Sequence, residues 1–298
     1  MVKIENGKHL NMNAIIMKNQ NLQVKLLPDL GFKIASIVHL PKQKEFLFQP
    51  TKNKYSIPNY NDKFGKYDTS GLDDVIPTID ECIYPHGKFK GKLLPDHGDV
   101  WSMKWDVDVF ENKVVGHVML KSLPLKLTRS IEFSNDDTIK LNYTVKNLDD
   151  GDVYFIWALH GLNTFDDYTE FIFEEDMLDV INVHDNEDLS KINLKKLNSY
   201  ENNRAYKYYF LNKLSKGEVG INYTKEKLKY IIKYDPNILP YLGIWVTKGG
   251  FKGEYNCAIE PSNGFYDSLF TAYQNNKLPC LSSHEEINWT IEIQILEY

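Results

Sequence analysis

The chain has 298 residues, and its hydrophobic fraction of 42% is enough apolar material for a substantial core. Its net charge of −6 comes without a long run of like charge, and its lysines are scattered. This pattern lacks the basic footprint of a nucleic-acid-binding protein and makes an anionic membrane surface a poor partner. We therefore expect a neutral small molecule as the ligand.

The cysteines and the N-terminus bear on the cellular location. Cys82, Cys257 and Cys280 are an odd number without the paired spacing of a metal site, which favours a reducing environment over a disulfide framework. Residues 1–19 lack the continuous apolar core of a signal peptide, and no window approaches the length of a membrane span. We expect a soluble, cytoplasmic protein whose oligomeric state the sequence does not indicate.

Alternation of apolar and polar residues, the period of a half-buried β-strand, runs through the chain. The clearest runs are residues 101–109, 125–133, 138–146, 228–234 and 289–296. The polar residues 134–137 join the second run to the third, which predicts an antiparallel hairpin with one buried face. β-Branched and aromatic residues are abundant in these runs, as a pleated surface favours.

Helical periodicity is rare. The best candidate is SLFTAYQNN, residues 268–276, and Asp267 is placed to cap it. The polar residues 184–203 predict a long surface excursion. No Pro/Gly/Ser-rich linker and no internal repeat divides the chain. The pattern therefore predicts one all-β domain over residues 1–298, a large antiparallel two-sheet β-sandwich with few short helices.

Two histidines lie within distinctive segments. His97 lies in PDHGDVW, where proline and glycine predict a turn before the aromatic Trp101; a solvated turn histidine is the alternative to a functional one. His160 ends the apolar run in FIWALHGLNTF, where partial desolvation can bring the pKa of an imidazole into the range for proton transfer. The alternative is a core histidine hydrogen-bonded to a backbone carbonyl.

Three carboxylates stand out as well. Glu260 ends the expected strand CAIE, and a carboxylate there is costly to bury without a partner. That partner is either a substrate hydroxyl or a structural lysine or backbone amide. Asp73 and Asp74 lie in SGLDDVIP, which predicts an acidic loop. Such a pair is usually solvent-facing, and the functional alternative is a pair of acceptors for ligand hydroxyls.

Other catalytic motifs are absent from the sequence. It contains no G-x-S-x-G elbow, no phosphate-binding glycine loop and no HExxH. His117 falls within an alternating run and is most simply a strand residue. The remaining histidines share no ligand-like spacing, so we expect no metal site.

Taken in chain order, these segments resemble the aldose 1-epimerase (galactose mutarotase-like) family. The matching segments are LGFKIASIVHLPKQKEFLF (30–48), SGLDDVIPTIDEC (70–82), PDHGDVWSMKW (95–105), WALHGLNTF (157–165), AIEPSNGFYDSL (258–269) and LPCLSSHEEINWTIEIQIL (278–296). Each is short, but together they span nearly the whole chain. The resemblance implies a β-supersandwich with a sugar pocket across one concave sheet.

The resemblance also implies roles for the matched residues. Glu260 would be the general base that removes the proton of the anomeric hydroxyl, and His160 the general acid that protonates the ring oxygen. His97 would hydrogen-bond the sugar and stabilise charge on that oxygen. No cofactor is implied. Trp101 or Trp245 would cover the apolar face of the ring, although tryptophan is often plain core.

One departure from the family concerns hydroxyl recognition. The family carries an arginine upstream of the first histidine, whereas this chain has only Arg129 and Arg204, neither of them in that region. Asp73 and Asp74 occupy the neighbourhood, so we expect them to bind sugar hydroxyls. The identity of the sugar stays open, and the shortage of arginine argues against a sugar phosphate.

Three functions follow from these patterns. The first is a mutarotase that interconverts the anomers of a neutral aldose. The second is a non-catalytic sugar-binding protein on the same fold. The third is a glycoside hydrolase with Asp73 or Asp74 as the second carboxylate beside Glu260, which requires the two carboxyl groups to lie about 5–10 Å apart across a scissile bond.

Overall fold

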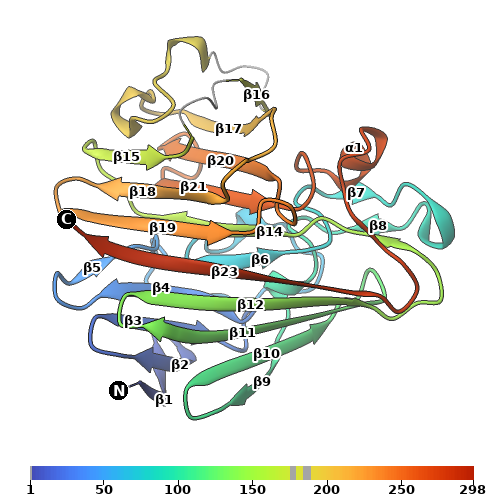
Figure 1. Ribbon diagram of the computed structural model, residues 1–298, viewed down its shortest axis with the longest axis horizontal. Helices are drawn as coiled ribbons and strands as arrows, with labels where there is room; N and C mark the ends of the chain where they lie inside the picture. Colours follow the sequence, from blue (N-terminus) through green and yellow to red (C-terminus); the bar gives the residue numbers. More distant parts are fainter. Residues whose placement is uncertain (1, 175–178, 184–188) are drawn as a thin grey trace.

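The computed structural model describes residues 2–174, 179–183 and 189–298. Within these residues, two large antiparallel sheets pack against each other, as Figure 1 shows. Part of the polar segment predicted as a surface excursion, residues 184–188, lies outside the described residues. The predicted all-β, two-sheet β-sandwich with few helices is confirmed.

The first sheet contains most of the N-terminal strands and five strands from the second half of the chain. In spatial order it runs β1 (Lys3–His9), β2 (Met12–Lys18), β3 (Leu22–Leu27), β4 (Lys33–His39), β6 (Leu72–Val75), β14 (Ala158–Asn163), β21 (Tyr255–Ser262), β20 (Tyr241–Lys248), β17 (Ala205–Phe210) and β16 (Val180–Asn182), with β5 (Lys44–Glu45) beside β4. The later strands β14, β21, β20 and β17 are consecutive neighbours, so one part of the sheet gathers residues from distant segments.

The second sheet lies nearer the viewer in Figure 1. It runs β15 (Thr169–Ile172), β18 (Glu218–Tyr223), β19 (Leu228–Tyr234), β23 (Glu286–Glu297), β12 (Thr138–Asn147), β11 (Leu125–Asn135), β10 (Lys113–Met119) and β9 (Asp106–Val109). Two small pairs complete the strands: β13 (Val153–Tyr154) with β22 (Cys280–Leu281), and β7 (Cys82–Ile83) with β8 (Leu93–Leu94).

Helices are few and short. The described residues contain α1 (Leu269–Gln274) and the 3-10 turns η1 (Phe64–Lys66), η2 (Gly87–Phe89), η3 (Val100–Ser102), η4 (Leu189–Lys191) and η5 (Leu197–Ser199). The described part of the predicted excursion is irregular apart from η4 and η5. No helix among the described residues has the length and apolar character needed to cross a membrane.

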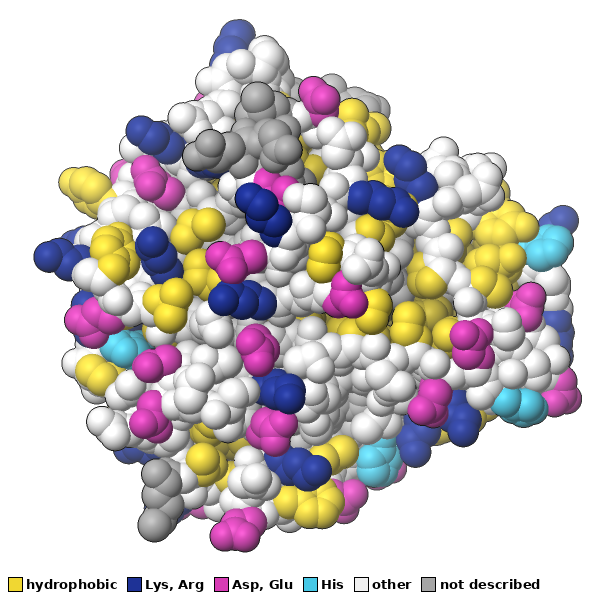
Figure 2. Space-filling model, viewed as in Figure 1, with side chains coloured by type: hydrophobic (Ala, Val, Ile, Leu, Met, Phe, Trp, Pro, Cys, Tyr) yellow, Lys and Arg dark blue, Asp and Glu magenta, His cyan; other side chains and the backbone are white. Residues whose placement is uncertain are grey.

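The core fills the space between the two sheets, because alternate residues of each strand point inward. Tyr143 of β12 is part of this core, stacked on Trp289 of β23 at 5.2 Å between ring centroids and edge-on to Trp157 at 4.8 Å. In β11 and β12 of the second sheet the remaining residues point outward and are less buried. Figure 2 shows acidic and basic side chains interspersed on the near side of the molecule.

Most strand predictions are confirmed. β11 and β12 form the expected hairpin, with Leu125 opposite Asn147, and His117 is a strand residue of β10. Residues 228–234 coincide with β19, and residues 289–296 lie within β23. These strands show a simple alternation because one face of the sheet is buried and the other is wet.

Two predictions of local structure are wrong. Residues 101–109 are not one strand: η3 covers Val100–Ser102, and β9 begins only at Asp106. Trp101 and Trp105 are both buried, and their indole N–H groups donate to the carbonyls of Asp96 and Val100 within the turn. The N-cap of α1 is Ser268 and not the predicted Asp267: the Ser268 side chain accepts a hydrogen bond from the backbone amide of Thr271.

Candidate functional site

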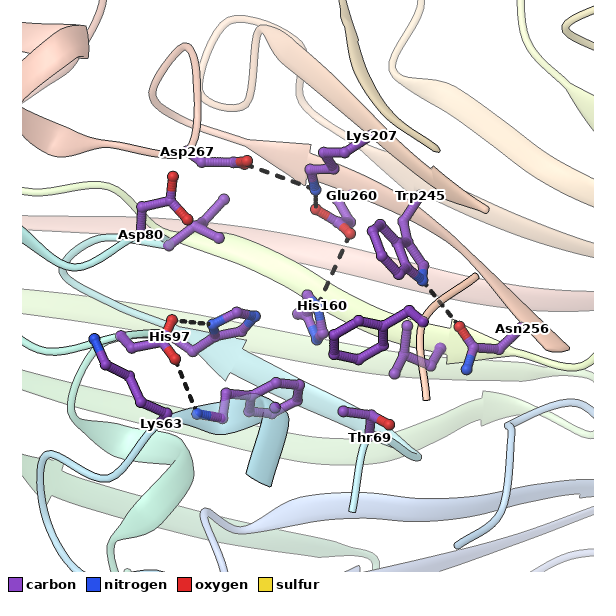
Figure 3. A pocket seen from close by; sticks show the side chains of 16 residues that line it. Lys63, Thr69, Asp80, His97, His160, Lys207, Trp245, Asn256, Glu260 and Asp267 are labelled. Atoms are coloured by element: carbon purple, nitrogen blue, oxygen red, sulfur yellow. Dashed lines mark hydrogen bonds and ion pairs between the residues drawn. The ribbon is translucent and has the colours of Figure 1, made fainter. Parts of the chain in front are cut away.

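A cavity of about 390 Å³ lies on the face of the first sheet that points away from the second sheet. Its floor is formed by β14, β21, β20 and β17, and the segment around η1 together with residues 79–80 and 96–97 closes its sides (Figure 3). The volume falls at the lower end of the roughly 300–1,000 Å³ that small-molecule sites occupy. His97, His160, Trp245 and Glu260 all line it.

The register of the sheet explains why these side chains meet. Ala158 pairs with Ser262 and Leu162 with Ala258, so His160 lies opposite Glu260 between the two pairs. Glu260 pairs in turn with Gly243 of β20. Side chains that are opposite each other on antiparallel strands share a face and approach within about 4.5–5.5 Å at Cβ. The sheet itself therefore holds the imidazole and the carboxylate together.

Glu260 is fully buried and lies between two partners. Its Oε2 accepts from the ammonium of Lys207, and its Oε1 lies 4.0 Å from Nε2 of His160. Oε1 has no hydrogen-bond partner among the described residues. Burial raises the pKa of Glu260, and the Lys207 ammonium opposes that shift. The sequence analysis expected the strand to end at Glu260. In the structure, β21 continues through Pro261 to Ser262.

His160 lies in the middle of β14 and not at its end. Its ring meets Phe64 edge-on at 5.2 Å and His97 edge-on at 5.0 Å between centroids. Within the described part of the chain, its Nδ1 is buried and has no hydrogen-bond partner from another residue. Burial lowers the pKa of His160 well below its ordinary value, and the nearby His97 and Lys207 lower it further.

His97 lies in the predicted turn, with its own backbone in the left-handed region at φ 57°. Its Nδ1 is 2.9 Å from a carboxylate oxygen of Asp96, and its ring stacks on Phe64 at 4.1 Å. Gly98 follows at φ 68°, and a Cβ there would lie 2.0 Å from the carbonyl oxygen of Ile76. Only glycine allows this close approach, which presses the His97 turn against the sheet.

Lys207 is the main site residue that the sequence analysis missed. It projects from β17 beside Glu260, and its Nζ also lies 3.7 Å from Oδ1 of Asp267 (Figure 3). Tyr209, two residues along the same strand, donates to the same carboxylate of Asp267. Burial acts to lower the pKa of Lys207, but the two carboxylates outweigh it and raise the pKa. The structural lysine considered as an alternative partner for Glu260 is therefore present, within the cavity.

Comparison with known proteins finds similarity in structure and not in sequence. No protein-family model matches the sequence, and neither does any curated protein. Solved structures do match. A galactose mutarotase-like protein from Clostridium acetobutylicum is 12% identical, with a TM-score of 0.70 and coverage of 100% of this chain and 99% of its own. The Slr1438 protein from Synechocystis sp. PCC 6803 is 12% identical, with a TM-score of 0.72 and coverage of 99% and 96%.

A GalM/aldose epimerase homologue from C. elegans is 14% identical, with a TM-score of 0.66 and coverage of 100% of this chain and 99% of its own. Identities this low carry the fold and nothing finer. The chain has the galactose mutarotase-like fold. The architecture implied by the resemblance of the sequence segments is thereby confirmed.

Within this mutarotase-like fold, the two tryptophans have different positions. Trp245 of β20 lines the cavity, and its indole Nε1 donates to Oδ1 of Asn256 at 3.0 Å. Trp101 is buried outside the cavity lining, with its ring edge-on to Phe64 at 5.0 Å between centroids. The expectation that Trp101 covers a ligand is therefore corrected: it packs against Phe64, and Phe64 lines the cavity.

The expectation for Asp73 and Asp74 is corrected as well, because neither lines the cavity. They lie on β6, where successive side chains point to opposite faces of the sheet. Asp73 is bound by the Lys33 ammonium at 2.6 Å, and Asp74 by Arg129 of the second sheet at 2.6 Å. All four side chains are buried, so these pairs are part of the scaffold.

The positions of Asp73 and Asp74 remove support for a glycoside hydrolase, since each is held in an ion pair and neither lines the cavity with Glu260. Among the described residues, no group of three or more His, Cys, Asp or Glu side chains is arranged to hold a metal ion. The groups at the centre of the cavity floor are the Glu260 carboxylate, the His160 imidazole and the Lys207 ammonium, and the His97 imidazole lies beside them.

Proposed function

We propose that the protein is an aldose 1-epimerase, a mutarotase that interconverts the α and β anomers of a neutral aldose. The observation that carries the proposal is the position of Nε2 of His160, 4.0 Å from Oε1 of Glu260, in a cavity of monosaccharide size. The solved structures with this fold that are named for galactose mutarotase or aldose epimerase support the same assignment.

The reaction requires two proton transfers. Glu260 removes the proton from the anomeric hydroxyl through Oε1, and His160 delivers a proton to the ring oxygen as the C1–O5 bond breaks. The open-chain aldehyde rotates about C1–C2, and the reverse transfers close the ring on the other face. His97 lies against His160 and hydrogen-bonds the sugar near the ring oxygen, where negative charge develops.

The charge and shape of the cavity favour a neutral sugar. Its carboxylates outnumber its ammonium groups, Asp80, Asp96, Glu260 and Asp267 against Lys63 and Lys207. A sugar phosphate or a uronic acid would meet net negative charge. Apolar side chains offer a surface for the C–H face of a pyranose ring, namely Phe64, Ile79, Leu162, Trp245 and Phe251.

The second candidate is a non-catalytic sugar-binding protein on the same fold. The observation that favours it is the Lys207 ammonium, which already occupies one oxygen of Glu260. A binding protein would take up a neutral aldose and leave the rate of anomer exchange unchanged.

Polarimetry separates the two candidates. Freshly dissolved α-anomers of neutral hexoses and pentoses are followed with and without the protein, and binding of the same sugars is measured by calorimetry. Faster decay of optical rotation for at least one sugar is expected of a mutarotase. Binding without acceleration across the panel would replace the proposed activity with the binding function.

A further inference from the structure

Lys207 occupies an unusual position, because its ammonium is buried on the floor of the cavity against the carboxylate that acts as base. Taking a charged ammonium out of water is costly unless nearby carboxylates compensate it. Lys207 has two of them, Glu260 in direct contact and Asp267 at 3.7 Å. The arrangement is held from a third side by Tyr209, which donates to Asp267.

The ammonium binds only one side of Glu260. It occupies Oε2, while Oε1 is turned towards His160 and has no partner among the described residues. The free oxygen is thus the one that faces the imidazole and the cavity. A single bound oxygen fixes the orientation of the carboxylate and leaves the other oxygen to receive a proton.

Glu260 and His160 compete for one proton, since each is both a possible base and a possible acid. An ammonium in contact with the carboxylate stabilises its ionised form, and the same charge disfavours an imidazolium nearby. We propose that Lys207 is a positioning residue that keeps Glu260 ionised with Oε1 free, and so makes Glu260 the base of the reaction. This inference rests on the proposed mutarotase function.

The groups around Glu260 come from several elements and act in known directions. Burial raises the pKa of Glu260, and so does the carboxylate of Asp267, whereas Lys207 and, from its turn, His97 oppose that rise. Asp80 lies on the same side and acts on Lys207. Removing the Lys207 charge should therefore raise the pKa of Glu260, and removing the Asp267 charge should lower it.

The test is the titration of Glu260 in the ligand-free protein, followed by ¹³C NMR of protein labelled at the glutamate carboxyl carbon. The Glu260 signal is assigned by its loss in Glu260→Gln. In Lys207→Met we expect Glu260 to titrate about one pH unit or more higher than in the wild type. Lys207→Arg keeps the positive charge, so Glu260 should titrate in this variant at a pH close to the wild-type value. Lys233→Met, on the exposed face of β19, is the matched control and should leave Glu260 unchanged.

In Asp267→Asn the pKa of Glu260 should shift in the opposite direction, below the wild-type value. This variant keeps the test decisive if Lys207→Met does not fold. Unchanged titration of Glu260 in Lys207→Met, or an upward shift in Asp267→Asn, would overturn the inference. The pH profile of mutarotation is the second readout: loss of the ammonium should move both limbs to higher pH, whereas a merely structural role lowers the rate without moving them.

These measurements also separate the inference from the proposed function. A wild-type protein that accelerates no sugar, yet shows the expected titration shifts, defeats the mutarotase assignment and leaves the effect of Lys207 on Glu260 intact. An active wild-type protein in which Lys207→Met leaves the Glu260 titration in place defeats the inference alone.

Discussion

Nε2 of His160 lies 4.0 Å from Oε1 of Glu260, and the two side chains stand opposite each other on adjacent strands β14 and β21. The distance is a property of the sheet register, because the neighbouring pairs Ala158–Ser262 and Leu162–Ala258 fix it on both sides. The sheet therefore holds the imidazole and the carboxylate as a preformed pair, and under the proposed mutarotase function conservative replacement of either one should affect the reaction more than the fold.

Glu260→Gln should reduce the rate of mutarotation by about 10²–10⁴-fold, the range that a positioned general acid or base contributes. Glutamine keeps the shape of the side chain but cannot accept the anomeric proton. Polarimetry of a freshly dissolved aldose measures the loss. Glu218→Gln, on the exposed surface of the second sheet, is the control. Wild-type activity in Glu260→Gln would assign the base to another group.

His160→Ala distinguishes an enzyme from a binding protein. If His160 protonates the ring oxygen, the variant should lose mutarotation by a similar factor while the affinity for the sugar falls only modestly, since other side chains that line the cavity remain. Calorimetry and polarimetry on one preparation give both values. A wild-type protein without activity, together with unchanged affinity in the variant, would favour the binding function.

The pH dependence of kcat/KM should show an optimum on the acid side of neutrality. In the proposed mechanism, the active form has Glu260 as carboxylate and His160 as imidazolium. Burial raises the pKa of Glu260, so activity is lost as pH falls through that value; burial lowers the pKa of His160 well below its ordinary 6.5, so activity is lost as pH rises through that value. An optimum above neutrality would contradict the assignment of His160 as the acid.

Arg129→Met should destabilise the fold by about 3–5 kcal/mol, because it leaves the buried carboxylate of Asp74 without its cation. Urea denaturation measures the loss. Lys233→Met breaks the exposed pair with Glu218 and should cost only about 0–1 kcal/mol. Equal effects of the two variants would contradict the structural role given to Asp74.

The strands were predictable from the sequence because alternation is a local signal. β11, β12 and β19 each bury one face, and their residues repeat with period two. Residues 101–109 show the limit of this signal, since a turn that buries Trp101 and Trp105 produces the same alternation as a strand.

The partners of the charged residues were not predictable. Asp73 and Asp74 are adjacent in sequence, but the pleat sends them to opposite faces of the sheet, where Lys33 and Arg129 bind them. Lys207 lies 53 residues before Glu260, and only the order of strands β21, β20 and β17 brings the two together. A lysine within the aromatic run AYKYYF was the available signal, because a charge in a buried strand requires a partner.

Gly98→Ala should displace the His97 turn. The new Cβ would lie 2.0 Å from the carbonyl oxygen of Ile76, and the backbone at φ 68° is strained for any residue with a side chain. Gly91→Ala is the matched control, because Gly91 has φ 86° but no atom within 4 Å of the added Cβ. It isolates the backbone strain, which costs about 1–2 kcal/mol.

We expect Gly98→Ala to lose more stability than Gly91→Ala and also to raise KM for the aldose, since the turn that carries His97 can no longer approach the sheet. Two backbone hydrogen bonds hold this turn: the amide of His97 donates to the carbonyl of Ile79 at 2.6 Å, and the amide of Asp99 donates to the carbonyl of Ile76 at 2.8 Å. Denaturation curves and polarimetry of both variants make the comparison. Equal losses in the two would show that contact between Gly98 and Ile76 is not what holds His97 at the cavity.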